Sequence, residues 1–269
     1  SAASDVYKRQ VDDKVRIPPF REATRENPVI SSKWCDSARQ RVLFEDTDLL
    51  VFNKPAGIAV HGGSGLNFGV IDVLHQTFGT HLELVHRLDK DTSVCLLLAK
   101  SSSVGRALQA LFREGKVAKK YLCLVKGHFS RREISCDARL KTQRKDLGQA
   151  KTQVDPNGKR ARSIFRRLGN YLADDVACAH LEVEIETGRT HQIRVHAAYL
   201  EHPIAGDTRY GDQSFNHRLA RLGLSRMYLH ASTLDFRHPT QQGRLSISAA
   251  EAPELVQFLS KLNGKRGKG

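Results

Sequence analysis

Hydrophobic residues recur along the first half of the chain at spacings that predict a pair of strands, a helix, a buried strand and a second helix. Residues 41–57 (RVLFEDTDLLVFNKPAG) hold two apolar runs separated by the polar turn EDTD, which predicts two strands. Beyond a glycine-rich loop, residues 69–78 have helical apolar spacing, and Asn67 is their predicted N-cap. The apolar run at 94–100 predicts a buried strand, and the periodicity of 103–114 predicts a helix that ends at a glycine.

The second half of the chain is richer in strands. Residues 119–127 (KKYLCLVKG) are apolar on both faces, as in a central strand, whereas 180–188 (HLEVEIETG) alternate apolar and acidic residues as in a half-buried strand. Thr190 is the predicted cap of a helix over 191–200. The last two predicted elements are a strand and a helix, at 245–249 and 253–262. Successive strands with irregularly placed helices predict an α+β fold: one domain on a largely antiparallel mixed β-sheet with flanking helices.

The pattern weakens toward the two ends of the chain. Residues 1–10 show no periodicity, and 11–40 are polar, with three prolines and one short candidate strand at 13–19 (DKVRIPP). The sequence therefore predicts a disordered leader and linker, a globular domain and a basic tail, at 1–40, 41–262 and 263–269.

The net charge indicates the class of partner. Lys and Arg total 43 against 29 Asp and Glu, which gives a formal charge of +14. Such an excess favours a polyanion through counterion release, although a solvated basic surface without a ligand is the alternative. Basic residues gather in the irregular stretch 137–170, which we expect to contact RNA; a solvated hairpin with lysines protecting its edges is the other interpretation. The basic residues of this stretch are Arg139, Lys141, Arg144, Lys145, Lys151, Lys159, Arg160, Arg162, Arg166 and Arg167.

No pattern in the sequence indicates a metal site, a disulfide framework or a membrane anchor. The five cysteines are odd in number and form no CxxC pair, which is typical of a reducing compartment. His191 and His196 are five residues apart, so a helix would place them on different faces. Every apolar run is shorter than the roughly 18 residues that span a bilayer. We therefore expect a soluble, cytoplasmic protein that uses neither a metal nor a cofactor.

Reactive side chains concentrate in three segments at the ends of predicted elements. These are 86–89 (HRLD), 120–121 (KY) and 188–194 (GRTHQIR). Taken alone, Asp89 is most simply a turn or capping residue, and Tyr121 a core residue of its apolar strand. His86 and His191 also leave open a metal-free ribonuclease with a histidine acid and base.

In their order and spacing these segments resemble the large-subunit ribosomal RNA pseudouridine synthases of the RluA family. The likeness rests on VHRLDKDTS, KKYLCLVKG and TGRTHQIRVHAAYLEHPIAGDTRYGD, and NKPAGIAVHGGSG resembles most the bacterial subgroup called synthase C. It covers roughly residues 41–262. The resemblance implies the pseudouridine synthase fold and the isomerisation of specific uridines in large-subunit ribosomal RNA, without a cofactor.

The same resemblance implies a role for particular residues. In this family the uridine is flipped out of the RNA, its N1–C1′ bond is broken, the base turns and C5 is joined to C1′. Asp89 matches the catalytic carboxylate, Arg194 its basic partner, and Tyr121 the tyrosine that lies against the target uracil. Five residues match substrate-binding positions: Arg87, which fills the space left by the flipped base, and His86, Arg189, Ile193 and Lys54.

The chain departs from the family pattern at several points. Val94 stands where a glycine usually follows DTS, and 159–163 (KRARS) replaces a KPxxT-like sequence. Members of the subgroup normally carry an upstream RNA-binding domain of the alpha-L type, of which residues 13–19 resemble only the last strand. The chain is then expected to be a catalytic fragment with weakened RNA affinity, and a monomer. The alternative function is a catalytically inactive RNA-binding or ribosome-assembly protein of the same fold.

Overall fold

The structure is a computed structural model that describes residues 30–62, 68–79, 81–86, 89–144, 150–173 and 175–263. The strands of its first half are β1 (Val42–Glu45), β2 (Leu49–Lys54), β3 (Glu83–Leu84), β4 (Ser93–Ala99), β5 (Ala118–Lys126) and β6 (Glu133–Cys136). The later strands are β7 (Leu140–Arg144), β8 (Ala150–Val154), β9 (Ser163–Ala173), β10 (Val176–Ile185), β11 (Leu229–Arg237) and β12 (Arg244–Ser248). The helices are α1 (Ser32–Arg39), α2 (Val70–Phe78), α3 (Ser102–Arg113), α4 (Gln192–Tyr199), α5 (Gln213–Arg221) and α6 (Pro253–Asn263).

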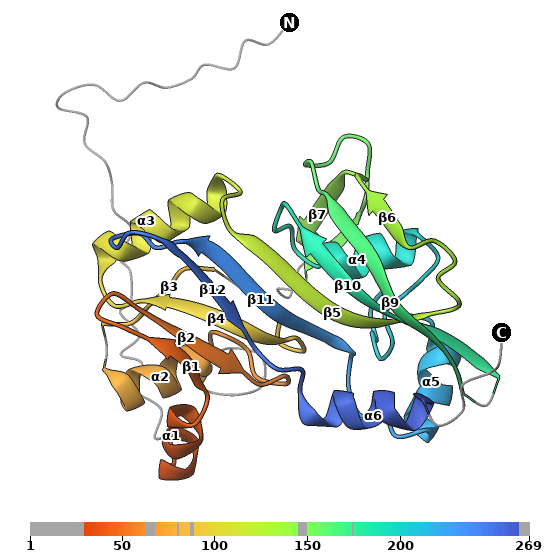
Figure 1. Ribbon diagram of the computed structural model, residues 1–269, viewed down its shortest axis with the longest axis horizontal. Helices are drawn as coiled ribbons and strands as arrows, with labels where there is room; N and C mark the ends of the chain where they lie inside the picture. Colours follow the sequence, from red (N-terminus) through yellow and green to blue (C-terminus); the bar gives the residue numbers. More distant parts are fainter. Residues whose placement is uncertain are drawn as a thin grey trace, which may run out of the picture.

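One large mixed sheet forms the body of the protein. Its strands run in the order β1-β2-β4-β11-β5-β10-β9-β6, with β12 paired to β11 and β3 paired to β4. Among the strand pairs of the described residues, β4 and β11 are parallel and the others antiparallel, so the predicted α+β fold is confirmed. Figure 1 shows α1, α2 and α3 gathered at the β1–β2–β4 end of the sheet and α4 at the β10–β9 end. No described helix has the length and apolar character needed to cross a bilayer.

The first strand pair and the helices beside it follow from local side-chain chemistry. Between β1 and β2, Asp46 accepts hydrogen bonds from the backbone N–H groups of Asp48 and Leu49, which closes the predicted EDTD turn. Helix α3 begins after Ser101, whose hydroxyl accepts from a backbone N–H of the first turn, and ends at the predicted glycine, which has a positive φ of 71°. Helix α2 has Gly69 as its N-cap; the predicted cap, Asn67, lies outside the described residues.

Helix α1 lies inside the segment that was expected to be a disordered linker, and the domain boundary predicted at residue 41 is wrong for residues 30–40. Cys35 and Ala38 are buried in the same hydrophobic cluster as the apolar residues of β2, β4 and α2. Trp34 packs edge-on against Phe68, with the ring centroids 6.0 Å apart. The short apolar stripe of α1 is masked in the sequence by the charged residues around it, which explains the error.

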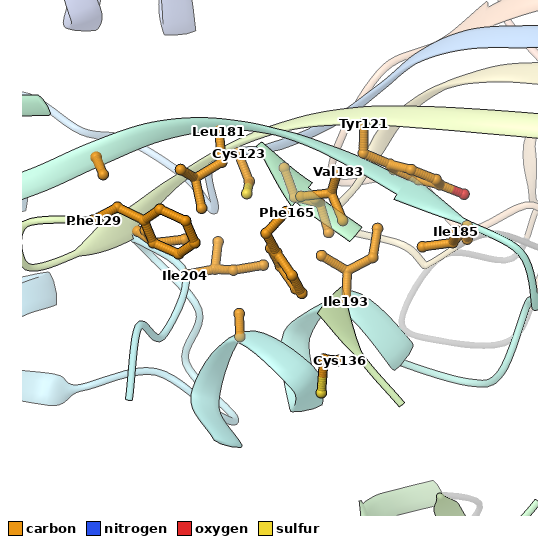
Figure 2. Packing of buried hydrophobic residues seen from close by; sticks show 14 of the residues in the cluster. Tyr121, Cys123, Phe129, Cys136, Phe165, Leu181, Val183, Ile185, Ile193 and Ile204 are labelled. Atoms are coloured by element: carbon orange, nitrogen blue, oxygen red, sulfur yellow. The ribbon is translucent and has the colours of Figure 1, made fainter. Parts of the chain in front are cut away.

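The core beneath β5 and β10 supports helix α4. Alternate residues of the two strands point to one face of the sheet, where they meet the buried side of α4. Figure 2 shows Ile193 of α4 rising toward this face beside Phe165, and Tyr121 and Ile185 together at one end of the cluster. Because Tyr121 and Ile193 belong to one packed cluster, the first half of β5 and the start of α4 are held in a fixed relation.

Several elements of the second half were not predicted. The basic stretch 137–170, expected to be irregular, forms the two-stranded sheet β7–β8 and most of the long strand β9. Strand β11, in the middle of the large sheet, and helix α5 were also absent from the prediction. Many basic side chains of β9 and its neighbours are paired across strands, as in the contacts of Arg166 with Glu133 and Glu184, both at 2.7 Å. The charge excess of this stretch is therefore partly neutralised by the protein itself.

Candidate active site

The three segments singled out in the sequence converge on one cleft. It lies between the C-terminal end of α3, the first half of β5 and the loop before α4. Its walls include six of the predicted site residues: His86, Asp89, Tyr121, Arg189, Ile193 and Arg194. Residues from β5, α4 and the loop before β4 thus meet in space, although Asp89 and Arg194 are 105 positions apart in sequence.

Asp89 and Arg194 form an ion pair at the base of the cleft. The Arg194 Nη1 donates to Asp89 Oδ2 at 3.1 Å, and the Asp89 side chain keeps 27% of its surface exposed. The other side of the guanidinium is bound by Asp207, with Nε donating to Oδ2 at 2.7 Å and Nη2 to Oδ1 at 2.8 Å. This bidentate contact fixes the plane of the guanidinium and therefore the position from which it reaches Asp89.

The charges of this triad stabilise one another. Burial disfavours the charged form of Arg194, but the hydrogen bonds and charge of Asp207, together with Asp89, more than offset it and raise the Arg194 pKa. Burial likewise raises the pKa of Asp207, yet Arg194 and the backbone N–H groups of Tyr210 and Arg209 outweigh it, so that the pKa is lowered overall. Asp207 has a fully buried side chain and remains ionised. Arg194 can consequently hold a second carboxylate, Asp89, at the surface of the cleft.

His191 faces Asp89 from the N-terminus of α4. It is the N-cap of the helix and adopts a left-handed conformation, with φ 55° and ψ 23°; the predicted cap, Thr190, precedes it. Its Nε2 lies 3.7 Å from Asp89 Oδ1, and its Nδ1 lies 2.8 Å from the hydroxyl of Tyr210. A non-glycine residue in this backbone conformation is strained, and such strain is concentrated at functional sites.

The hydroxyl of Tyr210 links His191 to the backbone of β8. It accepts a hydrogen bond from the backbone N–H of Thr152 at 3.0 Å, and its own proton can be donated to His191 Nδ1, 2.8 Å away. This donation favours the neutral tautomer that carries its proton on Nε2, the nitrogen that faces Asp89. Burial lowers the pKa of His191, which favours this neutral form.

Gln192 shapes the loop that carries Arg189. Its side-chain oxygen accepts from the Thr187 hydroxyl at 2.7 Å and from the backbone N–H of Arg189 at 3.1 Å. Its side-chain nitrogen donates to Arg162 O at 2.8 Å and to the Ser163 hydroxyl at 3.0 Å. Because this buried amide is satisfied on both sides, it ties the loop after β10 to the start of β9. The loop held in this way places α4, and with it Arg194, against the cleft.

Tyr121 lies in the wall formed by β5. Only 9% of its surface is exposed, and its cross-strand partners are Val183 and Ala231. Burial and the nearby charge of Asp89 raise the pKa of Tyr121, so the hydroxyl stays protonated. Tyr121 therefore packs in the core, as its apolar strand indicated, and also lines the cleft.

The remaining predicted binding residues have different environments. Arg189 is exposed and donates from Nε to Arg160 O at 3.0 Å, while Ile193 is 5% exposed and faces the cleft from α4. His86 stacks on Phe112, with ring centroids 4.8 Å apart, and its Nε2 accepts from the Leu97 N–H at 3.0 Å. The fifth residue, Arg87, lies outside the described residues.

Lys54 is not on the cleft wall, contrary to its expected contact with substrate. Its side chain is fully buried, and Nζ donates to three backbone carbonyls, those of Pro55, Ile58 and Lys90, at 2.9, 2.8 and 3.1 Å. Burial lowers its pKa to about 8. The carbonyl of Lys90 belongs to the loop that carries Asp89, so Lys54 braces this loop from behind.

The histidines considered for a metal site are engaged separately. His196 has its Nδ1 at 2.9 Å from the Ser163 hydroxyl and its Nε2 at 2.9 Å from Ala138 O. Within the described ranges, no group of three or more His, Cys, Asp or Glu side chains could hold a metal ion. All five cysteines are free and buried. Burial raises the pKa of the Cys95 and Cys123 thiols, which makes them poor nucleophiles.

Two residues of the site were not singled out in the sequence. Asp207 and Tyr210 both occur in the run AGDTRYGD, in the segment between α4 and α5. The Arg194 guanidinium lies over the Tyr210 ring, 5.1 Å from its centroid, so Tyr210 contacts both Arg194 and His191. A buried arginine requires a carboxylate partner, and this requirement was the available signal for Asp207.

Comparison with known proteins places this arrangement in a family. The model of the family described as RNA pseudouridylate synthase matches residues 48–199. Ribosomal large subunit pseudouridine synthase C of Escherichia coli (strain K12) is 43% identical over 267 residues, which cover 97% of this chain and 82% of the relative. The synthase C of Vibrio cholerae serotype O1 is 40% identical over 262 residues, covering 95% of this chain and 81% of the relative.

Solved structures agree at the level of the fold. Human RNA Pseudouridylate Synthase Domain Containing 4 is 26% identical with a TM-score of 0.67, over 85% of this chain and 95% of that one. Human RNA Pseudouridylate Synthase Domain Containing 1 shares the fold at 22% identity, with a TM-score of 0.63 over 85% and 96% of the two chains. The matched region contains Asp89, Tyr121 and Arg194. The chain therefore belongs to the RNA pseudouridylate synthase family of enzymes.

Proposed function

We propose that this chain isomerises specific uridines of large-subunit ribosomal RNA to pseudouridine, with Asp89 as the catalytic carboxylate. The observation that carries the proposal is the Asp89–Arg194–Asp207 arrangement at the base of the cleft. A carboxylate that must meet an electron-poor sugar has to stay ionised and remain accessible. Arg194, itself fixed by the buried Asp207, holds the Asp89 carboxylate in place, and the partial exposure of Asp89 supports access.

In this proposal the target uridine leaves the RNA and enters the cleft between Tyr121 and Asp89. Asp89 starts the reaction, at the ribose C1′, at the uracil C6 or by assisting glycal formation, and the N1–C1′ bond breaks. The base turns and C5 joins C1′. Tyr121 stacks against the uracil. Because its hydroxyl stays protonated, it can assist the loss of the C5 proton only as a relay, accepting that proton on its oxygen while it passes its own to solvent; N1, which has lost its bond to C1′, takes up a proton in turn.

The other cleft residues act in recognition. Ile193 packs against the base, and Arg189 contacts the RNA backbone from the rim. Arg87 fills the gap left by the flipped base. His86 borders the site, but its ring is already engaged with Phe112 and Leu97, so we assign it to the shape of the wall rather than to a bond with substrate.

Ribosomal RNA is proposed as the substrate because the relatives are named for the ribosomal large subunit. The excess of basic residues supports a polyanionic substrate. An inactive RNA-binding protein of the same fold is the competing function. The constellation of Asp89, Tyr121 and Arg194 supports the enzyme, because an accessible carboxylate in the cleft would repel an RNA backbone and has no use in binding alone.

The test is pseudouridine formation in an unmodified large-subunit ribosomal RNA transcript, mapped by carbodiimide-dependent primer-extension stops. The native chain is expected to produce stops at specific uridines, and Asp89→Asn, which keeps the size of the side chain but removes its charge, is expected to produce none. Asp91→Asn, two residues along the same loop and outside the cleft wall, is the matched control and should retain the stops. Binding of the transcript by both proteins without any stops would instead establish the RNA-binding function.

A further inference from the structure

Lys119 is a buried cation in the wall of the cleft. It precedes Tyr121 by two residues on β5, so the two side chains point to the same face of the strand, while that of Lys120 points to the other. Lys119 is 6% exposed and lines the cleft. Its immediate neighbour Lys120, in contrast, is paired with Glu182 at 3.3 Å.

No acidic side chain in the described part of the chain compensates the charge of Lys119. Its Nζ lies 5.9 Å from the centroid of the Phe112 ring, which is also stacked on the ring of His86 and packs against the hydrophobic cluster of β2 and β4. Burial alone lowers the pKa of this lysine, and its charge in turn depresses the pKa of His86. Lysines are almost never buried without a partner, because the loss of hydration is costly.

We propose that Lys119, seated on the Phe112–His86 stack, is a phosphate-binding subsite of the cleft and takes one backbone phosphate next to the flipped uridine. A single ammonium with three donors on an apolar seat is suited to a compact anion. Binding the phosphate would supply the missing counter-charge in a position that water reaches only through the cleft. The aromatic stack fixes the direction of the side chain, so the subsite is formed before RNA arrives.

A phosphate fits this position better than a base edge. Uracil carbonyls are neutral acceptors and cannot compensate a buried positive charge, whereas a phosphate carries a full negative charge. Phosphate contacts fix the register of a nucleic acid on a protein without reading its sequence. Lys119 would therefore determine how the strand enters beside Tyr121. The inference rests on the proposed function, because it requires RNA in this cleft.

The subsite is tested by the salt dependence of RNA binding in an Asp89→Asn background, where turnover cannot interfere. The probe is a labelled single-stranded oligoribonucleotide with one central uridine. Lys119→Met is expected to reduce the slope of log K against log salt by about 0.7, the value for one phosphate on a single strand. Lys120→Met removes the same charge from the opposite face of the strand and is expected to leave the slope unchanged. Lys119→Arg is expected to restore it in part.

A second arm locates the phosphate. Each backbone phosphate of the probe is replaced in turn by an uncharged methylphosphonate. One replacement is expected to weaken binding to Asp89→Asn several-fold, but not to the Asp89→Asn, Lys119→Met protein, because their effects report the same contact. Lys119→Met is also expected to raise the Tm of the free protein, since it removes an uncompensated buried charge; Lys119→Gln replaces it if the methionine variant does not fold.

The outcomes separate the two proposals. If RNA binds but Lys119→Met or Lys119→Gln keeps the full salt slope and the response to every methylphosphonate, the phosphate subsite is overturned while the proposed function stands. If Asp89→Asn and the native chain bind no RNA at low salt, the proposed function itself fails.

Discussion

Asp207 binds Arg194 through both of its carboxylate oxygens, at 2.7 and 2.8 Å, and its side chain is fully buried. The catalytic carboxylate proposed here, Asp89, is held by the same guanidinium at 3.1 Å. The position of Asp89 is thus set by a residue that does not itself line the cleft. The arginine can bind one carboxylate loosely because it binds the other tightly.

Asp207→Asn is expected to lower both stability and activity. The substitution leaves a buried guanidinium without its strongest partner, and breaking such a pair costs about 3–5 kcal/mol. Asp212→Asn is the matched control, because Asp212 pairs with Lys126 at a more exposed position and asparagine also serves as an N-cap. Its cost is expected to be under about 1 kcal/mol. Urea unfolding of the two variants measures the difference.

The same pair predicts a dependence of stability on acid. The Asp207 pKa is lowered in the folded state, so its contribution to stability is complete above the unfolded value of about 4 and is lost as pH falls through the lower folded value. Asp207→Asn should therefore lose less stability than the native chain below pH 4. Parallel acid-induced unfolding curves for both proteins would contradict this assignment of the charge.

Lys54→Met is expected to impair catalysis through the loop that carries Asp89. The methionine fills the buried space but leaves the carbonyls of Pro55, Ile58 and Lys90 without their donor, at about 1–3 kcal/mol for such unsatisfied groups. Because one of these carbonyls lies next to Asp89, kcat should fall while KM changes little. Lys126→Met, at a half-exposed ion pair, is the control and should keep kcat. A rise of KM alone would indicate that Lys54 contacts substrate, as the family resemblance implies.

Lys54 also shows where prediction from sequence ends. Its place after an apolar strand and before Pro55 is compatible with a substrate contact or a structural role, because the partners that distinguish them are backbone carbonyls without a sequence signal. Similarly, Asp89 precedes β4 and Arg194 follows β10, and two strands lie between β4 and β10 in the sheet. Only the family resemblance connected the two residues before the structure was known. Helical apolar spacing was sufficient for α2 and α3, and β5 was recognised because it is apolar on both faces, in agreement with the successive burial of its residues 123–125.

The elements that were missed share a physical reason. Helix α1 is short and mostly polar, so its two buried residues, Cys35 and Ala38, leave little periodic signal. The long strand β9 carries Arg166, which is neutralised by acidic residues on β6 and β10, and Arg167, which donates to the backbone carbonyls of Phe129 and Ser130. Such pairing joins strands that are distant in sequence, so the sequence of one strand alone cannot reveal it.

His86 predicts a second dependence on pH. Burial, and then the charge of Lys119, lowers its pKa to about 3, so the folded state binds fewer protons than the unfolded state between about pH 3 and 6.5. Stability should therefore fall as pH drops below 6.5, by up to about 1.4 kcal/mol per pH unit from this residue. His86→Gln keeps an acceptor for the Leu97 N–H but does not titrate. Its stability relative to the native chain should improve from pH 7 to pH 5, as measured by urea unfolding; no change would refute the neutral state of His86.

Tyr210→Phe is expected to lower kcat by removing the hydroxyl that orients His191, while the fold stays intact. The variant keeps the ring against Arg194 but removes the hydroxyl that bonds both His191 Nδ1 and the Thr152 N–H. The imidazole then loses the hydroxyl that orients it and favours a proton on Nε2, so we expect kcat to fall by about tenfold, equivalent to roughly 1.4 kcal/mol in the barrier, with KM nearly unchanged. Tyr199→Phe removes a hydroxyl from a tyrosine that is 58% exposed and should keep the native kcat. Equal activity of both variants in single-turnover assays would show that the orientation of His191 does not matter for the reaction, and the remaining support of Asp89 would then lie with Arg194 alone.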